Sequence, residues 1–427
     1  MPMSPDAQGR ALAVLNRVAQ AHWPDRFNLR KAFEKLLYSG TRAGFRLAAR
    51  RARKTPRRLA GADDVFDLSL SDEQRMLVEM LAAFALEALR PAAHEADVRG
   101  AVPAKLLNQA HALGLAHYGV GESLGGLAGA RTILTNALMA ESLAKGDLSL
   151  AAALLGPLSA ANCIRRWASP EQQAAWLPAF VAEQPAPRIA LAVSEPTVLF
   201  DPLKLSTRAQ RKGKHYVLSG EKCLVLDGLE ASRLIVAAET DRGPALFMVE
   251  AGSRGLQLRQ EPAMGLKACG TARIRLKGVK VPVENRLTAD DFVYQDFLDL
   301  SYLAWCALAV GAAQAALDYV VGYCNERTAF GEPISHRQGV AFIVADIAIE
   351  LDAMRLMLWR ACARVDRGEA FQREAYLARL FCAEKAMKIG TDAVQLLGGH
   401  GFTQEHPAER WYRDLRAVAL MSGGLHL

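Results

Sequence analysis

The sequence lacks the features that mark membrane-spanning, secreted and disulfide-bonded proteins. No stretch approaches ~20 uninterrupted apolar residues, so a membrane-spanning helix is not expected. The N-terminal residues lack the apolar core and the small-residue cleavage site of a secretory signal. With 427 residues, of which 51% are hydrophobic, the chain can bury a large core in two or three domains. We therefore expect a soluble, globular, cytoplasmic protein.

Disulfide and metal-site patterns are also missing. The seven cysteines are scattered, show no CxxC spacing and have no histidine at metal-ligand spacing. This pattern predicts reduced, mostly buried thiols. His400 and His406 stand close together in the sequence, but no third ligand is in view, so no metal is predicted. Hydrogen bonding around their own turn is the expected role of both imidazoles.

Positive charge is concentrated at one end. Residues 1–58 carry fourteen Lys and Arg against three Asp and Glu, a net charge of +11 within a total of +7, which leaves −4 for the remainder. The body of the chain therefore gives no electrostatic reason to expect nucleic acid as a partner.

Residues 1–65 form a basic extension, and its segment 29–58 has the pattern of an amphipathic helix. Apolar residues share one face and cations recur every fourth residue on another, at Leu29, Phe33, Leu36 and Leu37 and at Arg42, Arg46, Arg50 and Lys54. Such a helix could lie peripherally on an anionic inner-membrane surface. Three alternatives stay open, namely a helix docked on its own protein, a mobile basic arm and an organellar transit peptide.

Three regions follow the extension, each with its own hydrophobic period. Helical spacing dominates residues 66–185, where Ser71 stands as an N-cap before two acidic residues. A period of two, as in HYVLSGEKCLVL, predicts a compact antiparallel β domain over residues 186–285. Long helices with wide apolar stripes return over residues 286–427 and predict a four-helix bundle. The fold class is therefore α+β, with a cleft where the three domains meet.

The motif ERTAFGEPISHRQ at 326–338 has groups suited to a nucleotide. Arg327 is a planar cation that matches a diphosphate, and Phe330 can cover a flat ring or a sugar. Gln338 offers a neutral donor and acceptor. Taken alone, Arg327 is as well explained by an ordinary surface ion pair.

A second motif, QLLGGHGFTQEHPAERWYRD at 395–414, adds a glycine-rich turn. Gly398 and Gly399 let the backbone approach a ligand closely, and Gln395 can reach the same ligand from the preceding turn. Taken alone, the two glycines are as well explained by a helix C-cap. Glu409 and Arg413 are four residues apart and predict an ion pair on one helix.

Together with LAVSEP at 191–196 and SGEK at 219–222, these motifs make the chain resemble the acyl-CoA dehydrogenase family of flavoproteins over residues 66–424. The resemblance implies FAD as the cofactor, acyl-CoA thioesters as substrates and α,β-dehydrogenation as the reaction. It also implies an oligomer in which the residues of the motifs at 326–338 and 395–414 hold the ADP half of a neighbouring subunit's FAD. An electron-transfer flavoprotein is a candidate partner.

The resemblance assigns Ser194, Val225 and Leu226 to the flavin ring, and here the chain departs from the family. The family pattern Thr-Glu-Pro-x-Ala-Gly-Ser-Asp appears as SEPTVLFD at 194–201, and the family's Trp-Ile-Thr appears as LVL at 224–226. A tryptophan face and a threonine hydroxyl are therefore absent. Since each lost hydrogen bond costs about 1 kcal/mol, flavin binding can survive these changes.

The family's catalytic glutamate is missing as well. It stands at one of two positions in relatives, which the resemblance places at Ser422 and Ser301. A serine hydroxyl without a His or Lys partner is too weak a base to remove the α-proton of a thioester. Asp299 is the nearest carboxylate in sequence and a candidate base, while the family's Thr-bearing tail is replaced by GGLHL.

Three functions therefore remain open. The first is an acyl-CoA dehydrogenase that is impaired, or that depends on a partner, because the base is missing. The second is a non-catalytic subunit of a heteromer, a candidate pseudoenzyme that lends its nucleotide-binding groups to a sister chain. The third is a flavin-dependent oxygenase or oxidase, whose chemistry does not need the carboxylate. Acyl chain length cannot be read from the sequence.

Overall fold

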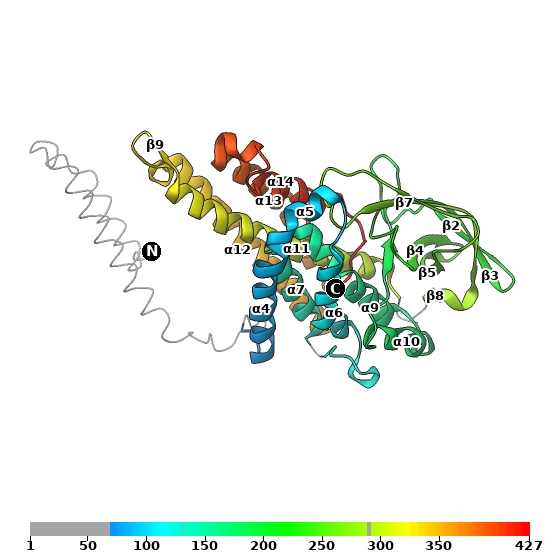
Figure 1. The fold of residues 1–427 in the computed structure, drawn as a ribbon. Helices are drawn as coiled ribbons and strands as arrows, with labels where there is room; N and C mark the ends of the chain where they lie inside the picture. The colour runs from blue at the N-terminus through cyan, green and yellow to red at the C-terminus, as the bar shows by residue number, and fades with distance from the viewer. Residues whose placement is uncertain (1–68, 130, 288–291) are drawn as a thin grey trace, which may run out of the picture. The chain divides into compact units, whose positions relative to one another are not determined.

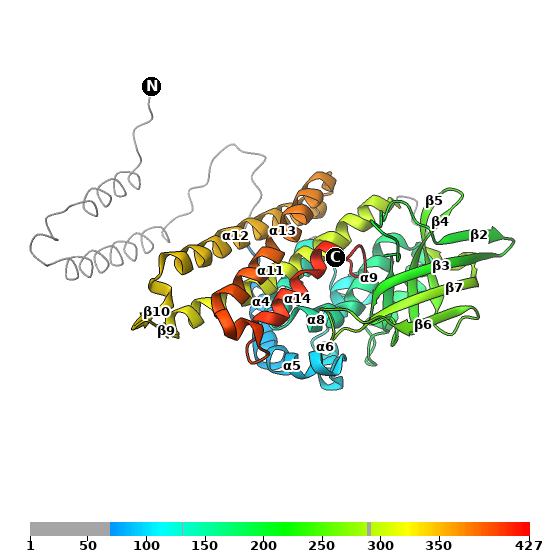
Figure 2. The ribbon, with the colours of Figure 1, turned by 90° about the horizontal axis from the view of Figure 1, so that it is seen from above.

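The computed structural model describes residues 69–129, 131–287 and 292–427, and the predicted basic extension lies outside the described residues. Helices come first, a β-sheet follows, and long helices complete the fold, as Figures 1 and 2 show. This order confirms the predicted α+β fold class.

The first helical region begins where the sequence predicts it. The Ser71 hydroxyl accepts from the amide of Gln74, and the Gln74 side chain accepts in return from the amide of Ser71, both at 3.1 Å. This capping box confirms Ser71 as an N-cap. The helices of this region are α4 (Asp72–Phe84), the π-helical turn η1 (Ala85–Leu89), α5 (Arg90–Arg99), α6 (Ala104–Ala112), α7 (Thr132–Ala144), α8 (Leu148–Leu154), α9 (Gly156–Trp167) and α10 (Pro170–Trp176).

The central sheet has eight strands in the order β6-β7-β3-β2-β4-β5-β8, with β1 paired to β4. Most pairings are antiparallel, as predicted, but β1 and β2 both pair with β4 in parallel. β1 is buried at all four positions, which is typical of a strand covered on both faces. The strands are β1 (Ile189–Ala192), β2 (Arg208–Lys212), β3 (His215–Leu226), β4 (Arg233–Thr240), β5 (Gly243–Glu250), β6 (Leu256–Gln260), β7 (Thr271–Pro282) and β8 (Arg286–Leu287).

The last region is built on three long helices, which run side by side in Figure 2. A small hairpin joins the first to the second, and a short turn, η7 (Gly398–Phe402), follows the third. The elements are α11 (Tyr294–Glu326), the hairpin strands β9 (Thr328–Ala329) and β10 (Glu332–Pro333), α12 (Gln338–Asp366), α13 (Gln372–Leu397), α14 (Ala408–Leu415) and α15 (Ala417–Leu420).

Helix α11 forms the centre of the core. It packs on α7 so closely that a Cβ at Gly311 would lie 2.1 Å from the Glu141 carbonyl oxygen. By length and composition α11 alone among the described helices could cross a membrane, apart from the bent pair α8 and α9, but 89% of its most apolar window is buried inside the protein. That burial is what a core helix shows.

Several smaller sequence predictions are confirmed. All seven cysteines are free and buried. Arg413 pairs with Glu409 at 2.7 Å, and it also reaches Asp97 of α5 at 2.9 Å, so α14 is tied to the first helical region.

Candidate functional site

The predicted nucleotide-binding residues lie at the outer end of the long helices. Arg327 follows α11 directly, Phe330 lies in the turn of the β9–β10 hairpin, and Gln338 is the first residue of α12. We call the predicted set the nucleotide clamp, and all of its members are exposed: Arg327, Phe330, Gln338, Gln395, Gly398 and Gly399.

A groove of about 610 Å³ brings two parts of the clamp region together, the end of α11 with Arg327 and the turn that follows α13. The Tyr323 hydroxyl lies 2.8 Å from His400 Nδ1, and the Tyr319 hydroxyl lies 2.5 Å from His406 Nδ1. The two imidazoles stack with their centroids 5.2 Å apart. Both histidines therefore hold the turn by hydrogen bonds, as expected, although their partners come from α11.

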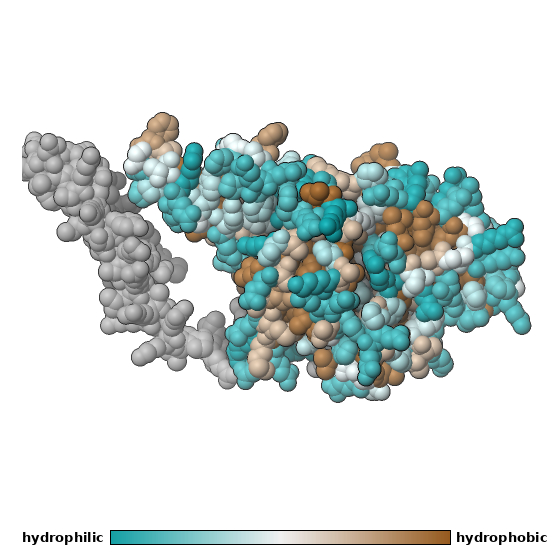
Figure 3. Space-filling model, viewed as in Figure 1, coloured by the Kyte–Doolittle hydropathy of each residue, from teal (hydrophilic) through white to brown (hydrophobic). Residues whose placement is uncertain are grey.

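Phe330 is held away from the core of its own chain. Its side chain is 96% exposed and its backbone has φ 57°, a left-handed conformation that is uncommon for a bulky residue. Figure 3 shows hydrophobic atoms protruding at this end of the hairpin. The Arg337 guanidinium lies 5.8 Å from the ring. Such a strained, exposed aromatic side chain is available to a ligand or to another protein chain.

Different physical constraints favour glycine at the different glycine positions of the turn. A Cβ at Gly401 would lie 2.3 Å from the Val394 carbonyl oxygen, so packing within the chain requires glycine there. Gly398 has φ 57°, which favours glycine through the backbone. Gly399 has neither a positive φ nor any atom within 4 Å of the Cβ it lacks. The fold itself therefore does not require glycine at 399, which leaves close approach of a ligand as a reason.

The positions assigned to the flavin ring lie at the end of β3 and just after β1, and all three are buried. The Ser194 hydroxyl donates to the Ser422 carbonyl at 3.1 Å. A Cβ at Gly424 would lie 3.7 Å from Leu226, and one at Gly423 would lie 2.4 Å from Val193. Val225 is 1% exposed. Residues 422–424 thus cover the positions that the ring would need.

A buried ion pair, which sequence reasoning missed, ties the segment after β1 to β3. The ammonium of Lys222 lies 2.8 Å from Glu195 and donates to the Val193 carbonyl at 2.9 Å. Burial lowers the pKa of Lys222 to about 8. Burial alone would raise the pKa of Glu195, but Lys222 and the amides of Ser206 and Thr207 hold it below its usual value. The Glu of LAVSEP and the Lys of SGEK were a signal, because an acidic and a basic residue in two β-rich runs can form a charge-assisted hydrogen bond when the runs lie side by side.

The two positions that the resemblance assigns to the base both hold buried serines. Ser301 is fully buried and its hydroxyl has no hydrogen-bond partner among the described residues. It lies one helical turn from Phe297 and one from Trp305, on the face of α11 that meets residues 422–427. Ser422 is 6% exposed. Among the described residues, neither serine has a hydrogen bond to a His or Lys side chain.

Asp299 lies on another face of α11, about 200° round the helix from Phe297. One carboxylate oxygen accepts from Gln295 at 3.0 Å, and the other has no partner among the described residues. Burial raises the pKa of Asp299 to about 6, while the Gln295 hydrogen bond lowers it. Its carboxylate has the pKa of a usable base, but it is not on the face of α11 that contains Ser301.

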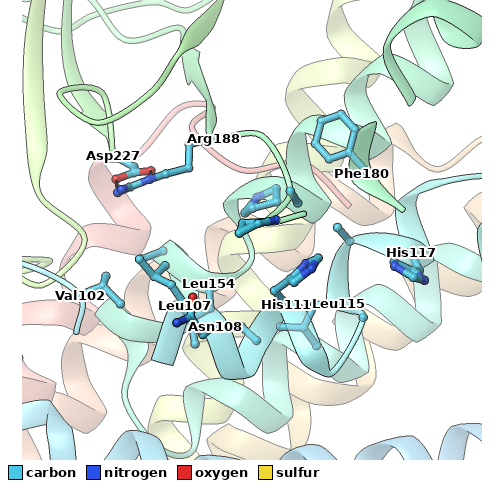
Figure 4. Close-up of a pocket in the computed structure, with 17 residues that line it drawn as sticks. Val102, Leu107, Asn108, His111, Leu115, His117, Leu154, Phe180, Arg188 and Asp227 are labelled. Carbon is cyan, nitrogen blue, oxygen red and sulfur yellow. Dashed lines mark hydrogen bonds and ion pairs between the residues drawn. The ribbon is translucent and has the colours of Figure 1, made fainter. Parts of the chain in front are cut away.

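A separate cavity of about 180 Å³ lies between α6, α8 and the segment before β1 (Figure 4). Apolar side chains and His111 line it, and the Arg188–Asp227 ion pair closes one end. None of the predicted site residues that the structure describes is among its lining residues. The cavity is therefore distinct from the candidate site.

The chain matches the family models of all three domains of one enzyme family. These are the acyl-CoA dehydrogenase N-terminal domain over residues 71–184, the middle domain over 190–279 and the C-terminal domain over 293–425. The chain belongs to the acyl-CoA dehydrogenase family.

Relatives with established names agree. The chain is 33% identical over 367 residues to cyclohex-1-ene-1-carbonyl-CoA dehydrogenase of Syntrophus aciditrophicus (strain SB), which covers 83% of this chain and 87% of that protein. It superposes on butyryl-CoA dehydrogenase from Megasphaera elsdenii with a TM-score of 0.76 and 28% identity, over 84% of this chain and 96% of that one. An FAD complex of PigA matches with a TM-score of 0.76 and 27% identity, over 84% and 96%.

FAD is the cofactor of this flavoprotein family, and the residues present fit its two halves differently. The clamp fits the ADP half, because it offers an exposed guanidinium, an exposed aromatic ring and a glycine that the fold does not require. The ring half does not fit while residues 422–424 keep their position, because Ser194 and Leu226 are covered by the chain itself.

Proposed function

We propose that this chain is an FAD-binding subunit that takes part in α,β-dehydrogenation of acyl-CoA thioesters but cannot perform it alone. The observation that carries the proposal is the pair of buried serines at the two base positions. Ser301 has an unpartnered hydroxyl among the described residues, and Ser422 is bound through its carbonyl to Ser194. Neither can replace a carboxylate.

The missing base determines how much dehydrogenation rate the chain is expected to lose. Dehydrogenation removes an α-proton while the β-hydride leaves for the flavin, and a positioned base typically contributes ~10² to 10⁴ in rate. Asp299 is the alternative base of an enzyme that works alone. Its place on another face of α11 argues against it, since a base must lie within hydrogen-bond reach of the proton.

The exposed clamp supports dependence on a partner. Arg327, Phe330 and Gln338 point away from the chain's own core and could hold the ADP half of a cofactor seated mainly in another subunit. The clamp and the base would then belong to different active sites, so a subunit without a base can still complete the site of a sister chain. A heteromer with an acyl-CoA dehydrogenase-like chain is therefore favoured over a homo-oligomer, with an electron-transfer flavoprotein as acceptor.

The extension gives the proposed location, which is cytoplasmic and peripheral on the inner membrane. Its charge of +11 over residues 1–58 would attract anionic lipid headgroups. Sedimentation with anionic and with neutral vesicles, for the full chain and for a chain without residues 1–58, tests this part by itself.

Flavin reduction tests the main proposal. The purified chain, loaded with FAD, is mixed anaerobically with butyryl-CoA or palmitoyl-CoA while the visible flavin band is followed. We expect little bleaching, and we expect Ser422→Glu or Ser301→Glu to increase it. Ser232→Glu, at an exposed position, is the matched control. Rapid bleaching by the unmodified chain, abolished in Asp299→Asn, would contradict the proposal.

The rate at which air reoxidises the reduced flavin tests the oxygenase alternative. If reduced flavin on the chain is reoxidised by air much faster than free reduced flavin, oxygen chemistry replaces dehydrogenation as the proposed reaction. Slow reoxidation supports the dehydrogenase assignment.

A further inference from the structure

The residues that follow Ser422 are buried beside the positions that the resemblance assigns to the flavin ring. After α15 the chain enters the space between β1, α9 and α11, and Figures 1 and 2 both place the last drawn residue beside α9. Gly423, Leu425, His426 and Leu427 are all buried, with Leu425 at 3% and Leu427 at 4% exposure. We call residues 423–427 the inserted segment.

The walls of the cleft bind the inserted segment through side-chain polar groups. Trp305 of α11 donates its indole N–H to the Gly423 carbonyl at 2.8 Å. On α9, the Ser159 hydroxyl accepts from the His426 amide, and Asn162 donates to the His426 carbonyl at 3.4 Å. These are side-chain-to-backbone bonds from two separate elements, as in a protein that holds a short peptide ligand.

The imidazole of His426 is buried and has hydrogen-bond partners at both ring nitrogens. Trp167 donates its indole N–H to Nε2 at 3.0 Å, so Nδ1 carries the proton and donates to the Leu427 carbonyl at 2.9 Å. The ring stacks on Phe297 with centroids 5.5 Å apart. Burial lowers the pKa of His426 to about 3, so the imidazole is neutral. Both ring nitrogens are satisfied, which stabilises the inserted position.

The two leucines fill an apolar slot. Leu425 and Leu427 lie against side chains of α9 and α11, and the space left beside them is about 20 Å³, room for about one water. The apolar lining of the slot is Ala140, Leu155, Leu158, Ala304 and Leu308. Asn136 and Ser159 also line the slot, so the leucine side chains occupy a site whose lining is mainly apolar and suits the end of an acyl chain.

We propose that the inserted segment is an autoinhibitory occupant of the chain's own cleft, which must leave before the flavin ring or an acyl chain can enter. This inference rests on the proposed function, because it concerns access to the same site. Where the competent state is a small fraction of the population, apparent affinity falls by that fraction. The segment therefore weakens binding of FAD and of acyl-CoA to its own subunit while leaving the exposed clamp free.

Binding measurements test the proposal without any turnover. Calorimetric titration with FAD, and then with palmitoyl-CoA, is compared between the full chain and a chain without residues 423–427. We expect about tenfold or more tighter binding of both after the deletion. In the full chain, the amides of 423–427 should exchange hydrogen faster once ligand is bound. Unchanged affinity in a folded deletion variant, or full amide protection at ligand saturation, would overturn the proposal.

Two point variants at neighbouring glycines provide a second test, in case the deletion variant does not fold. Gly423 and Gly424 have φ 87° and 86°, so alanine is equally strained at both. Only at 423 does the new Cβ meet a wall, 2.4 Å from Val193, whereas at 424 its nearest neighbour is 3.5 Å away. Gly423→Ala should therefore tighten FAD binding and Gly424→Ala should not. Equal effects of the two would count against an inserted segment that competes with the ligand.

Different measurements refute the proposal of a missing base and the proposal of an autoinhibitory segment. Bleaching of the flavin by the unmodified chain refutes the missing base whatever the affinities are. Equal affinities with and without residues 423–427 refute the occupant whatever the flavin does. A deletion variant that binds both ligands tightly and still does not bleach supports both.

Discussion

The hydroxyl of Ser194, two residues after β1, donates to the backbone carbonyl of Ser422 at 3.1 Å, although 228 positions separate the two residues. One of these residues belongs to the predicted flavin site and the other to a predicted base position. The contact joins the β domain to the segment after α15. It makes the Ser194 hydroxyl, which the resemblance assigns to the flavin ring, a support for the residue that precedes the inserted segment.

Ser194→Ala should loosen the inserted segment without unfolding the protein. Loss of one hydrogen bond costs about 1 kcal/mol, which is about a fivefold change in an opening equilibrium. Amides of residues 423–427 should exchange faster by about that factor, measured by mass spectrometry. Ser232→Ala, which removes an exposed hydroxyl bonded to the Arg188 carbonyl at 3.2 Å, is the control and should leave these amides unchanged. Equal exchange in both variants would show that Ser194 does not hold the segment.

Local patterns in the sequence predict most of the elements. HYVLSGEKCLVL, assigned to a strand by its period of two, is β3 over His215–Leu226. The cap at Ser71 and the ion pair of Glu409 with Arg413 depend on residues three and four positions apart, so the sequence spacing alone predicts them.

Features that depend on distant segments are not visible in the sequence. The parallel pairing of β1 with β4 needs a register between strands some forty positions apart. The Lys222–Glu195 pair requires β1 and β3 to be neighbours. The six residues SGGLHL at 422–427 have no helical or strand period, and only contacts with distant segments explain why all of them except Gly424 are buried.

Removing one partner of the buried ion pair should be strongly destabilising. Lys222→Met leaves Glu195 buried without its cation, which costs about 3–5 kcal/mol. The comparison is Arg75→Gln, because the Arg75–Asp72 pair has side chains 56% and 87% exposed and contributes about 1 kcal/mol or less. Urea denaturation midpoints at unchanged m-value measure both. Similar losses for the two variants would contradict the role assigned to the buried pair.

The glycine-rich turn allows binding to be separated from folding. Gly399→Ala should change the free energy of unfolding by less than about 0.5 kcal/mol, because no atom lies within 4 Å of the new Cβ. It should nevertheless lower the FAD content of the assembled protein, measured after gel filtration. Gly401→Ala is the contrast, since its Cβ would lie 2.3 Å from the Val394 carbonyl and should destabilise the fold. Unchanged FAD content in Gly399→Ala would remove Gly399 from the clamp.

The carboxyl group of Asp299 should make stability depend on pH with a definite sign. Burial raises its pKa from 3.8 to about 6, so the native chain holds a proton that the unfolded chain has released between these values. Stability is therefore lost as the pH rises from about 4 to about 6, by up to about 3 kcal/mol, and is constant above that window. Asp299→Asn, which keeps the shape of the neutral acid, should lack this loss. Denaturation midpoints of both proteins at pH values across the window check it, and a difference that is the same at every pH would show that folding does not raise the pKa of Asp299.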